Sequence, residues 1–200
     1  MKNEEIIHAD EDGFFTIALN VNGELGHMIV SRNETLVEAL RHYGWKGTKK
    51  GCDTGDCGSC TVLFNNKPVL GCMMPAVAAH GGNITTIEGI GTVRNPHPIQ
   101  QAFVEAGAVQ CGFCIPGMIL STKALLDKNP EPSEADIRKA LDGNLCRCTG
   151  YVTQVQAVRI AAKKVKAMKK QQEKLAAKEL AAEKRKAARK TAKKAAKKNK

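Results

Sequence analysis

The fold of this chain is decided by the stretch Gly51-Cys52-Asp53-Thr54-Gly55-Asp56-Cys57-Gly58-Ser59-Cys60, after which Cys72 follows at an interval of eleven residues. A tight loop that presents three thiols, with a fourth cysteine further along the chain, is the ligand spacing of plant-type iron–sulfur sites. The glycines let the backbone fold closely around a bulky group and direct amide N–H groups at its sulfurs. The stretch therefore predicts a cluster-binding loop.

A second group of four cysteines lies further along the chain. Cys111 and Cys114 are separated by two residues, Cys146 and Cys148 by one residue, and the two pairs by 31 residues. This spacing differs from the first, so the sequence predicts two separate sites rather than one shared network. We expect each group to bind its own iron–sulfur cluster.

Disulfide bonds and zinc ions are the alternatives. No N-terminal stretch combines a basic start, an apolar run and a small-residue cleavage site, so we expect a cytoplasmic protein whose thiols stay reduced. A single zinc ion does not require a cradle as long as Gly51 to Cys60, and the gap between Cys146 and Cys148 is shorter than the usual zinc spacing. The pattern favours iron–sulfur clusters and leaves zinc and disulfides open.

Charge is divided unevenly along the 200 residues. Residues 163–200 hold 17 Lys and Arg against three Glu, whereas residues 1–162 hold 14 basic and 17 acidic side chains. The net charge of +11 therefore belongs to a basic tail, and the body has the charge of an ordinary globular protein. No apolar run approaches the length needed to cross a bilayer.

The first half of the body has the pattern of a small sheet crossed by one helix. Two runs rich in strand-forming residues, Phe14 to Val21 and Leu25 to Val30, flank Asn22-Gly23, a dipeptide suited to a hairpin turn. Ser31-Arg32-Asn33-Glu34 has capping-box spacing and predicts a helix that ends at Gly44. Further strands are predicted at Thr61 to Phe64, Val69 to Cys72 and Ile84 to Ile87, with a turn at Asn65 to Pro68.

The second half has a helical pattern and follows a Gly- and Pro-bearing linker, Gly89 to Pro98. Helices are predicted at Ile99 to Ala106, at Gly117 to Asp127 after Pro116, at Ser133 to Leu141, and from Tyr151 onwards. The predicted fold class is therefore α+β, in which a small α+β domain precedes a compact four-helix domain.

In this arrangement the second cysteine group lies at two helix N-termini. Cys111 and Cys114 come just before the second predicted helix, and Cys146 and Cys148 come just before the fourth. Helix N-termini present unpaired N–H groups and partial positive charge, which stabilise an anionic cluster and influence its reduction potential.

Three strings carry a resemblance to a known family. They are Gly51 to Val62, Gln110 to Met118 and Gly143 to Tyr151. Together, in this order, they resemble the small iron–sulfur subunit of the xanthine oxidase family of molybdenum hydroxylases, and the resemblance covers roughly residues 12–162.

The resemblance implies a β-grasp plant-type ferredoxin domain at residues 12–90, a four-helix-bundle domain at residues 97–162, and one [2Fe–2S] cluster in each. The implied iron ligands are Cys52, Cys57, Cys60 and Cys72 in the first domain and Cys111, Cys114, Cys146 and Cys148 in the second. Residues 163–200 remain as a Lys/Ala-rich tail, which we expect to be a frayed helix or disordered because its like charges repel.

The resemblance also implies that this chain is an electron relay. In the family, a large subunit holds a molybdenum–pterin cofactor at which the substrate is hydroxylated. Electrons then pass through the helical-domain cluster, through the ferredoxin-domain cluster, and usually on to FAD in a medium subunit. Gln110 is similar to the family residue that hydrogen-bonds the pterin, and Cys148 resembles the cluster ligand nearest to it.

Two other functions are weaker explanations of the sequence. A free-standing ferredoxin-like electron carrier has no evident use for Gln110, and a nucleic-acid-binding protein leaves the cysteine motifs unexplained. The tail contains no aromatic residue to stack on a base, so nucleic-acid binding is not expected. We expect the tail to be a solvated extension or to contact an acidic partner protein.

One departure from the family lies at the start of the fourth predicted helix. Gln154 and Gln156 stand where the family usually has more apolar residues. The family pattern therefore does not predict what the first turn of this helix packs against.

Overall fold

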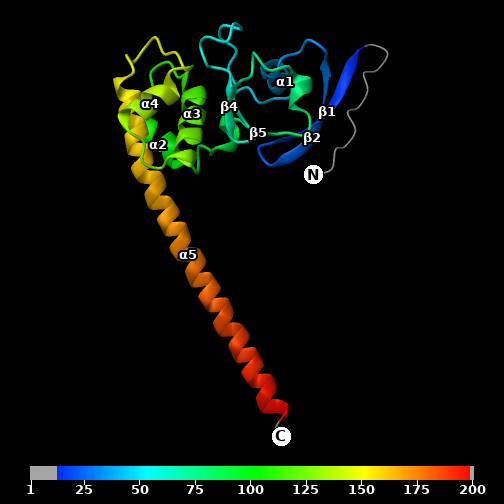
Figure 1. The fold of residues 1–200 in the computed structure, drawn as a ribbon, viewed down its shortest axis with the longest axis vertical. Helices are drawn as coiled ribbons and strands as arrows, with labels where there is room; N and C mark the ends of the chain where they lie inside the picture. Colours follow the sequence, from blue (N-terminus) through cyan, green and yellow to red (C-terminus); the bar gives the residue numbers. More distant parts are fainter. Residues whose placement is uncertain (1–12, 199–200) are drawn as a thin grey trace.

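The computed structural model describes the backbone of residues 13–198 and side chains as far as Lys178. Within these residues a five-stranded mixed sheet crossed by one helix is followed by four further helices (Figure 1). The strands are β1 (Phe14–Val21), β2 (Glu24–Ser31), β3 (Thr61–Phe64), β4 (Lys67–Leu70) and β5 (Asn83–Thr85). The helices are α1 (Leu36–His42), α2 (Pro98–Glu105), α3 (Ile115–Lys128), α4 (Glu134–Leu141) and α5 (Val152–Lys198).

The sheet has the order β2-β1-β5-β3-β4, in which only the β1–β5 pair is parallel. The predicted first hairpin is confirmed. Asn22 and Gly23 have φ angles of 56° and 94°, the left-handed conformation that a two-residue turn between twisted strands requires. The core between the sheet and α1 contains the buried side chains of Ile17, Leu19, Val21, Met28, Val30, Leu36, Leu40, Val62 and Ile84.

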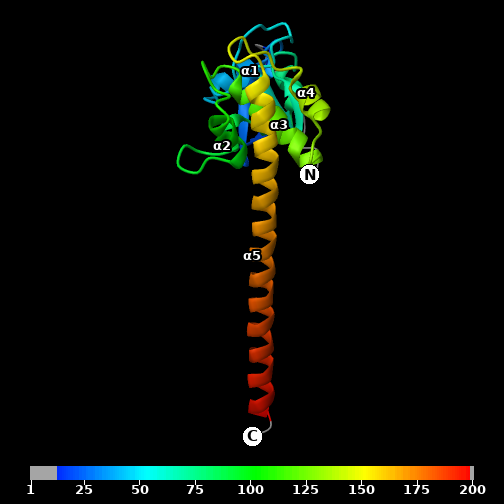
Figure 2. The ribbon, with the colours of Figure 1, turned by 90° about the vertical axis from the view of Figure 1, so that its left-hand side faces the viewer.

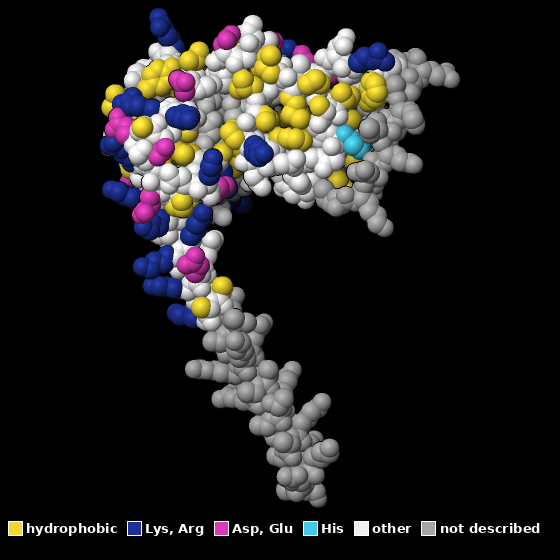
Figure 3. All heavy atoms as spheres, viewed as in Figure 1, with side chains coloured by type: hydrophobic (Ala, Val, Ile, Leu, Met, Phe, Trp, Pro, Cys, Tyr) yellow, Lys and Arg dark blue, Asp and Glu magenta, His cyan; other side chains and the backbone are white. Residues whose placement is uncertain are grey.

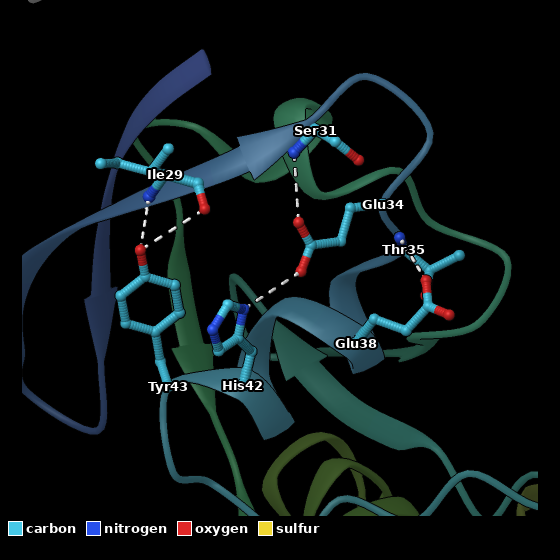
Figure 4. A network of polar contacts seen from close by, with 7 residues as sticks. All are labelled: Ile29, Ser31, Glu34, Thr35, Glu38, His42 and Tyr43. Atoms are coloured by element: carbon cyan, nitrogen blue, oxygen red, sulfur yellow. Dashed lines mark hydrogen bonds and ion pairs between the residues drawn. The ribbon is translucent and has the colours of Figure 1, made fainter. Parts of the chain in front are cut away.

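Helix α1 begins four residues later than the sequence predicted. Its N-cap is Thr35, whose amide and hydroxyl donate to Glu38 Oε2 at 3.0 and 2.7 Å (Figure 4). The predicted cap at Ser31 was wrong because Ser31 still belongs to β2. Its amide donates to Glu34 at 3.1 Å, so the same sequence spacing closes a turn before the helix. The predicted end of the helix is confirmed by Gly44, which has a φ of 102°.

Tyr43 covers part of the free edge of the sheet. Strand β2 is an edge strand in the described sheet, and the Ile29 amide in it donates to the Tyr43 hydroxyl at 2.6 Å (Figure 4). The hydroxyl also lies 3.4 Å from the Ile29 carbonyl oxygen. Because the outward backbone groups of Ile29 are satisfied from within the chain, this part of the edge is closed to pairing with another strand.

The second hairpin is tighter than predicted. Asn65 and Asn66 alone form the turn, both with left-handed φ angles of 49° and 65°, and β4 already begins at Lys67. Pro68 is tolerated inside this strand because β4 is the other edge of the sheet, where the missing N–H interrupts no ladder. Strand β5 is also shorter than predicted, because the chain enters a 3-10 turn at Ile87–Gly89.

The four predicted helices of the second half are confirmed, with shifted ends. Helix α3 begins at Ile115, which places Pro116 in its first turn. Ser133 caps α4, and its hydroxyl accepts a hydrogen bond from the Asp136 amide at 3.2 Å. The helical core is formed by Ile99, Phe103, Met118, Leu126, Ile137, Leu141, Val158 and Val165, all buried.

Helix α5 extends far beyond the domain to which it belongs. Its first part is held by buried residues as far as Val165 and by ion pairs to the body, such as Lys164 with Glu105 at 2.8 Å. From Lys166 to Lys198 it projects away from the body as a straight helix of about 50 Å (Figures 1 and 2). That the free tail frays or is disordered stays a prediction. Among the described helices, none combines the length and the apolar character of a membrane span.

The two halves of the body meet at a buried asparagine. Asn144 is 2% exposed, and its Nδ2 donates to the Gly58 carbonyl at 2.9 Å, while its Oδ1 accepts from the Ser121 hydroxyl at 2.7 Å. Next to it, the Leu145 amide donates to the Cys57 carbonyl at 2.9 Å. The contact at Gly58 is so close that a Cβ there would lie 1.9 Å from the Gly143 carbonyl oxygen. The first cysteine loop is therefore hydrogen-bonded directly to the segment that carries Cys146.

We expect Asn144→Ala to lower the free energy of unfolding by about 1–3 kcal/mol, because it leaves the buried Ser121 hydroxyl without its acceptor and removes the side-chain hydrogen bond to the Gly58 carbonyl, which then keeps its bonds from Thr61. Urea unfolding of the cluster-loaded protein measures the effect. The matched control is Asn95→Ala, an exposed asparagine in the linker, which should change the free energy by less than about 0.5 kcal/mol. Equal effects of the two substitutions would contradict a structural role for the Asn144 contact.

Candidate metal centres

The first four cysteines come together at one end of the sheet domain. Cys52 and Cys57 lie in the loop before β3, Cys60 directly precedes β3, and Cys72 follows β4. The sulfurs of Cys60 and Cys72 are 3.4 Å apart and both residues are buried. The Cys52 sulfur accepts a hydrogen bond from the Cys57 amide at 3.4 Å and contacts the Cys57 thiol. The four thiols therefore form two pairs.

The backbone around this loop is shaped to pass close to sulfur. Asp53, Gly55 and Gly58 have positive φ angles, and a Cβ at Gly51 would lie 3.0 Å from the Cys57 sulfur. A Cβ at Gly51 would also lie 2.6 Å from the Ser59 hydroxyl oxygen, so a side chain there would force the neighbouring groups to shift. This is the close approach that the glycines of the sequence predicted.

The two thiol pairs of the first group differ in their electrostatic surroundings. A hydrogen bond from the Thr54 hydroxyl, with others from backbone amides, lowers the pKa of Cys52 to about 6. Burial raises the pKa of Cys60 to about 11. The loop therefore favours an ionised thiolate at its outer side and a neutral thiol inside, and binding of a cation has to supply the charge compensation for the inner thiolates.

The second four cysteines come together at the N-termini of α3 and α5, as predicted. Cys114 is the N-cap residue of α3, and Cys146 and Cys148 lie in the turn that leads into α5. The Cys111 and Cys148 sulfurs are 3.6 Å apart and both residues are exposed. The Cys114 and Cys146 thiols contact each other further inside. This group too consists of an outer and an inner pair.

In the inner pair of the second group, one thiol has a raised pKa and the other has a lowered pKa. Burial raises the pKa of Cys114 to about 12. Burial also opposes ionisation of Cys146, but hydrogen bonds from the Thr149 hydroxyl and from backbone amides outweigh it and lower its pKa to about 7. A thiolate is thus favoured at Cys146 before any metal binds.

The pairing of the thiols distinguishes between the kinds of metal centre. A structural zinc site draws four ligands around a single metal ion. Each group instead offers two pairs of sulfurs, and a [2Fe–2S] cluster takes four cysteine ligands, two on each iron. The residues fit two such clusters.

The two remaining predicted site residues lie on the outer side of the second group. Gln110 is exposed and directly precedes the exposed Cys111, and Cys148 is the partner of Cys111 in the outer pair. Phe113, from the same motif, lies near the first loop, since a Cβ at Gly51 would be 3.3 Å from its ring. Gln110 and Cys148 therefore share the exposed side of the second group.

Sequence reasoning missed the side chains that surround Cys146. The Thr149 hydroxyl lies 3.2 Å from its sulfur, the Gln154 amide nitrogen donates to the same sulfur at 3.6 Å, and the Cys146 amide donates to the Tyr151 hydroxyl at 2.9 Å. Gln154 is fully buried, whereas Gln156 is exposed. The departure noted at Gln154 was the available signal, because a polar residue at an apolar position needs a polar partner.

Comparison with protein-family models gives two matches. Residues 19–77 match the 2Fe-2S iron-sulfur cluster binding domain, and residues 86–159 match the [2Fe-2S] binding domain. Each matched range contains one group of four cysteines. The two predicted cofactors are confirmed as two [2Fe–2S] clusters, one in each half of the body.

Characterised relatives agree with this. The chain is 50% identical over 150 residues to the nicotinate dehydrogenase small FeS subunit of Eubacterium barkeri, a match that covers 74% of this chain and 96% of the relative. It is 39% identical over 167 residues to the aldehyde oxidoreductase iron-sulfur-binding subunit of Escherichia coli O157:H7, over 76% of this chain and 73% of the relative.

The crystal structure of quinoline 2-oxidoreductase from Pseudomonas putida superposes with a TM-score of 0.73 at 38% identity, over 76% of this chain and 95% of that chain. In this family the molybdenum–pterin cofactor and FAD are held by partner subunits. The chain belongs to the small iron–sulfur subunits of the xanthine oxidase family of molybdenum hydroxylases, the subunits that transfer electrons through two [2Fe–2S] clusters.

Proposed function

We propose a specific set of ligands and a direction for electron transfer within this subunit. The first cluster is held by Cys52, Cys57, Cys60 and Cys72, and the second by Cys111, Cys114, Cys146 and Cys148. When bound, each cluster accepts and releases one electron at a time. The single observation that carries the assignment is the approach of the eight thiols in two groups of two pairs, with sulfurs 3.4 Å apart in the pair Cys60 and Cys72 and 3.6 Å apart in the pair Cys111 and Cys148.

Electrons enter the chain on the side of the second group's outer pair. Cys111 and Cys148 are exposed, which brings this pair closer to an external donor than any other pair. Four exposed apolar side chains lie within four residues of these cysteines along the chain, at Val109, Phe113, Leu145 and Val152. Exposed apolar side chains close to a redox site favour a protein–protein interface there. We infer that the partner that covers it is the large molybdenum subunit and that Gln110 hydrogen-bonds its pterin.

From the second group, the route to the first passes through the junction at Asn144. The Leu145 amide hydrogen-bonded to the Cys57 carbonyl joins a neighbour of Cys146 to the first cysteine loop. Electrons leave from the Cys52 side of that loop, toward FAD in a medium subunit or toward another acceptor. A free-standing carrier, the alternative function, leaves the exposed apolar side chains of Val109 and Phe113 beside Cys111 without a role.

The substrate is a property of the partner protein that holds molybdenum. Relatives of this chain serve nicotinate dehydrogenases and aldehyde oxidoreductases alike, so this kind of subunit does not select the substrate class. Eight cysteines that must stay available for iron also require a reducing compartment, which supports the cytoplasm as the location.

We expect the wild-type chain to contain about four irons and, when reduced, two distinct [2Fe–2S] signals in electron paramagnetic resonance (EPR) spectra. Cys60→Ala should remove one signal and about half of the iron, and Cys114→Ala should remove the other, because each takes a buried ligand from one cluster only. Iron analysis and EPR of dithionite-reduced protein measure both.

The controls for these variants are substitutions of outer-pair cysteines, which disturb the protein core less. Cys52→Ser should alter the same EPR signal as Cys60→Ala, and Cys111→Ser should alter the same signal as Cys114→Ala. A wild-type chain with a single cluster signal would overturn the two-cluster assignment. A substitution in one group that removes the signal of both clusters, with the fold retained in circular dichroism, would overturn the division into two groups.

The basic tail offers a second surface through which this subunit can contact a partner protein. Within the described side chains, the ion pairs of α5 end at Lys166, and residues 171–178 are all exposed (Figure 3). The segment 163–200 carries a balance of +14, so it attracts anionic surfaces by its charge. We propose that it docks on an acidic surface of a partner protein in the complex.

Truncation after Met168 tests this docking, because Val165 still belongs to the helical core and an earlier cut would disturb it. We expect the truncated chain to keep both clusters. Its affinity for the large subunit should fall about tenfold at low salt, with the difference shrinking as salt rises. Titration of the purified large subunit measures this. Equal affinities of the two chains at low salt would contradict the docking role.

A further inference from the structure

Gln154 is the one glutamine that the described fold buries completely, in the first turn of α5. A buried primary amide loses its hydration and must find partners inside the protein. Its Oε1 accepts from the Thr153 hydroxyl at 3.4 Å, while its Nε2 is directed at the turn that carries Cys146 and Cys148. The amide is therefore oriented, with its donor end toward the second cysteine group.

The donor end of Gln154 has two acceptors. Nε2 lies 3.6 Å from the Cys146 sulfur and also donates to the Thr149 hydroxyl oxygen. Because the Thr149 oxygen accepts from Gln154, its own proton is free to point to the Cys146 sulfur, 3.2 Å away. Gln154 thus donates to the sulfur directly and orients a second donor toward it.

The charge of a cysteine-bound cluster gives these hydrogen bonds a redox consequence. A one-electron reduction adds one negative charge to the cluster and its thiolates, without forming or breaking a bond. Donors that point at a ligand sulfur stabilise the more negative, reduced form more strongly than the oxidised form, and thereby raise the reduction potential. The effect on the reduction potential is larger for a buried donor, because water does not screen the interaction between the donor and the sulfur.

The affected ligand lies on the inner side of the second group. Cys146 pairs with the buried Cys114, and its neighbour Leu145 makes the backbone hydrogen bond to Cys57 in the first loop. The first group has hydroxyl groups of its own near its sulfurs, Ser59 at Cys57 and Thr54 at Cys52. The cysteine sulfur that Gln154 contacts belongs to the second group, so we expect its effect at that cluster.

We propose that Gln154 is a positioning residue that holds the donors around the Cys146 sulfur and raises the reduction potential of the second cluster relative to the first. The inference rests on the proposed role of Cys146 as an iron ligand. It assigns to Gln154 a function in setting the order in which the two clusters are reduced, and so in drawing electrons into the chain at the second cluster.

The test is Gln154→Met, which keeps a long unbranched side chain and removes both the amide donor and the acceptor. We expect the ratio of reduced to oxidised second cluster, at a fixed poised potential, to fall about fivefold, the equilibrium equivalent of one lost hydrogen bond. The second cluster's EPR line shape should change as well, and the first cluster should be unaffected. Redox titration of the full-length holoprotein followed by EPR measures all three.

Two controls make the result specific. Gln156→Met changes an exposed glutamine on the same helix and should leave both clusters unaltered. Gln154→Glu has the size of the wild-type residue but, when ionised, has no donor, and should lower the ratio at least as much as the Met variant. The signals are assigned beforehand by Cys60→Ala, which retains only that of the second cluster.

Each outcome bears on the proposal. An unchanged reduction potential of the second cluster in Gln154→Met would overturn the proposal, because Gln154 would then have no redox role. An equal shift in the potentials of both clusters would also overturn it, because such a shift indicates a general loosening of the fold. If Gln154→Met fails to retain the second cluster, the test is repeated with Gln154→Asn, whose amide lies one methylene further from the Cys146 sulfur. A lowered reduction potential of the second cluster in this variant would support the proposal, and an unaltered potential would contradict it. A wild-type chain with one cluster signal would instead refute the ligand assignment itself.

Discussion

The hydrogen bond from the Leu145 amide to the Cys57 carbonyl, 2.9 Å long, is the constraint on which the rest of the structure depends. It fixes the two cysteine-bearing segments to each other, and Asn144 reinforces it with a buried bond to Gly58. Such a junction has strict steric requirements, because Gly58 has no room for a Cβ against Gly143. Two small domains, each with a modest core, are thereby held as one body with their cysteine groups adjacent.

Within this frame, both centres follow the same physical pattern. Each has a buried thiol whose pKa is raised by burial, to about 11 at Cys60 and about 12 at Cys114. Each also has a thiol whose pKa is lowered by hydrogen bonds, to about 6 at Cys52 and about 7 at Cys146. With the proposed ligands, iron binding would offset the cost of ionising the buried thiols, so that the clusters would stabilise the fold that holds them.

Much of this was predictable from sequence, because the decisive signals are local. The turn at Asn22-Gly23, the cap at Ser133 and the two cysteine spacings each depend on a few neighbouring residues. The errors arose where the tertiary structure chose between local alternatives, as at Thr35, which caps α1 in place of Ser31 because β2 continues through Ser31. Contacts between distant segments, such as Asn144 with Gly58, leave no pattern in a single sequence, and at Gln154 the sequence marked an unusual polar residue without naming Cys146 as its partner.

We infer that two clusters lie side by side in this body, joined at Leu145 and Asn144, so that an electron on one can reach the other. Low-temperature EPR of the fully reduced protein tests it most directly, because two nearby unpaired spins split or broaden each other's lines. The account predicts that the fully reduced spectrum differs from the sum of the two single-cluster spectra, with splitting that disappears when only one cluster is reduced. A fully reduced spectrum that equals that sum would contradict it.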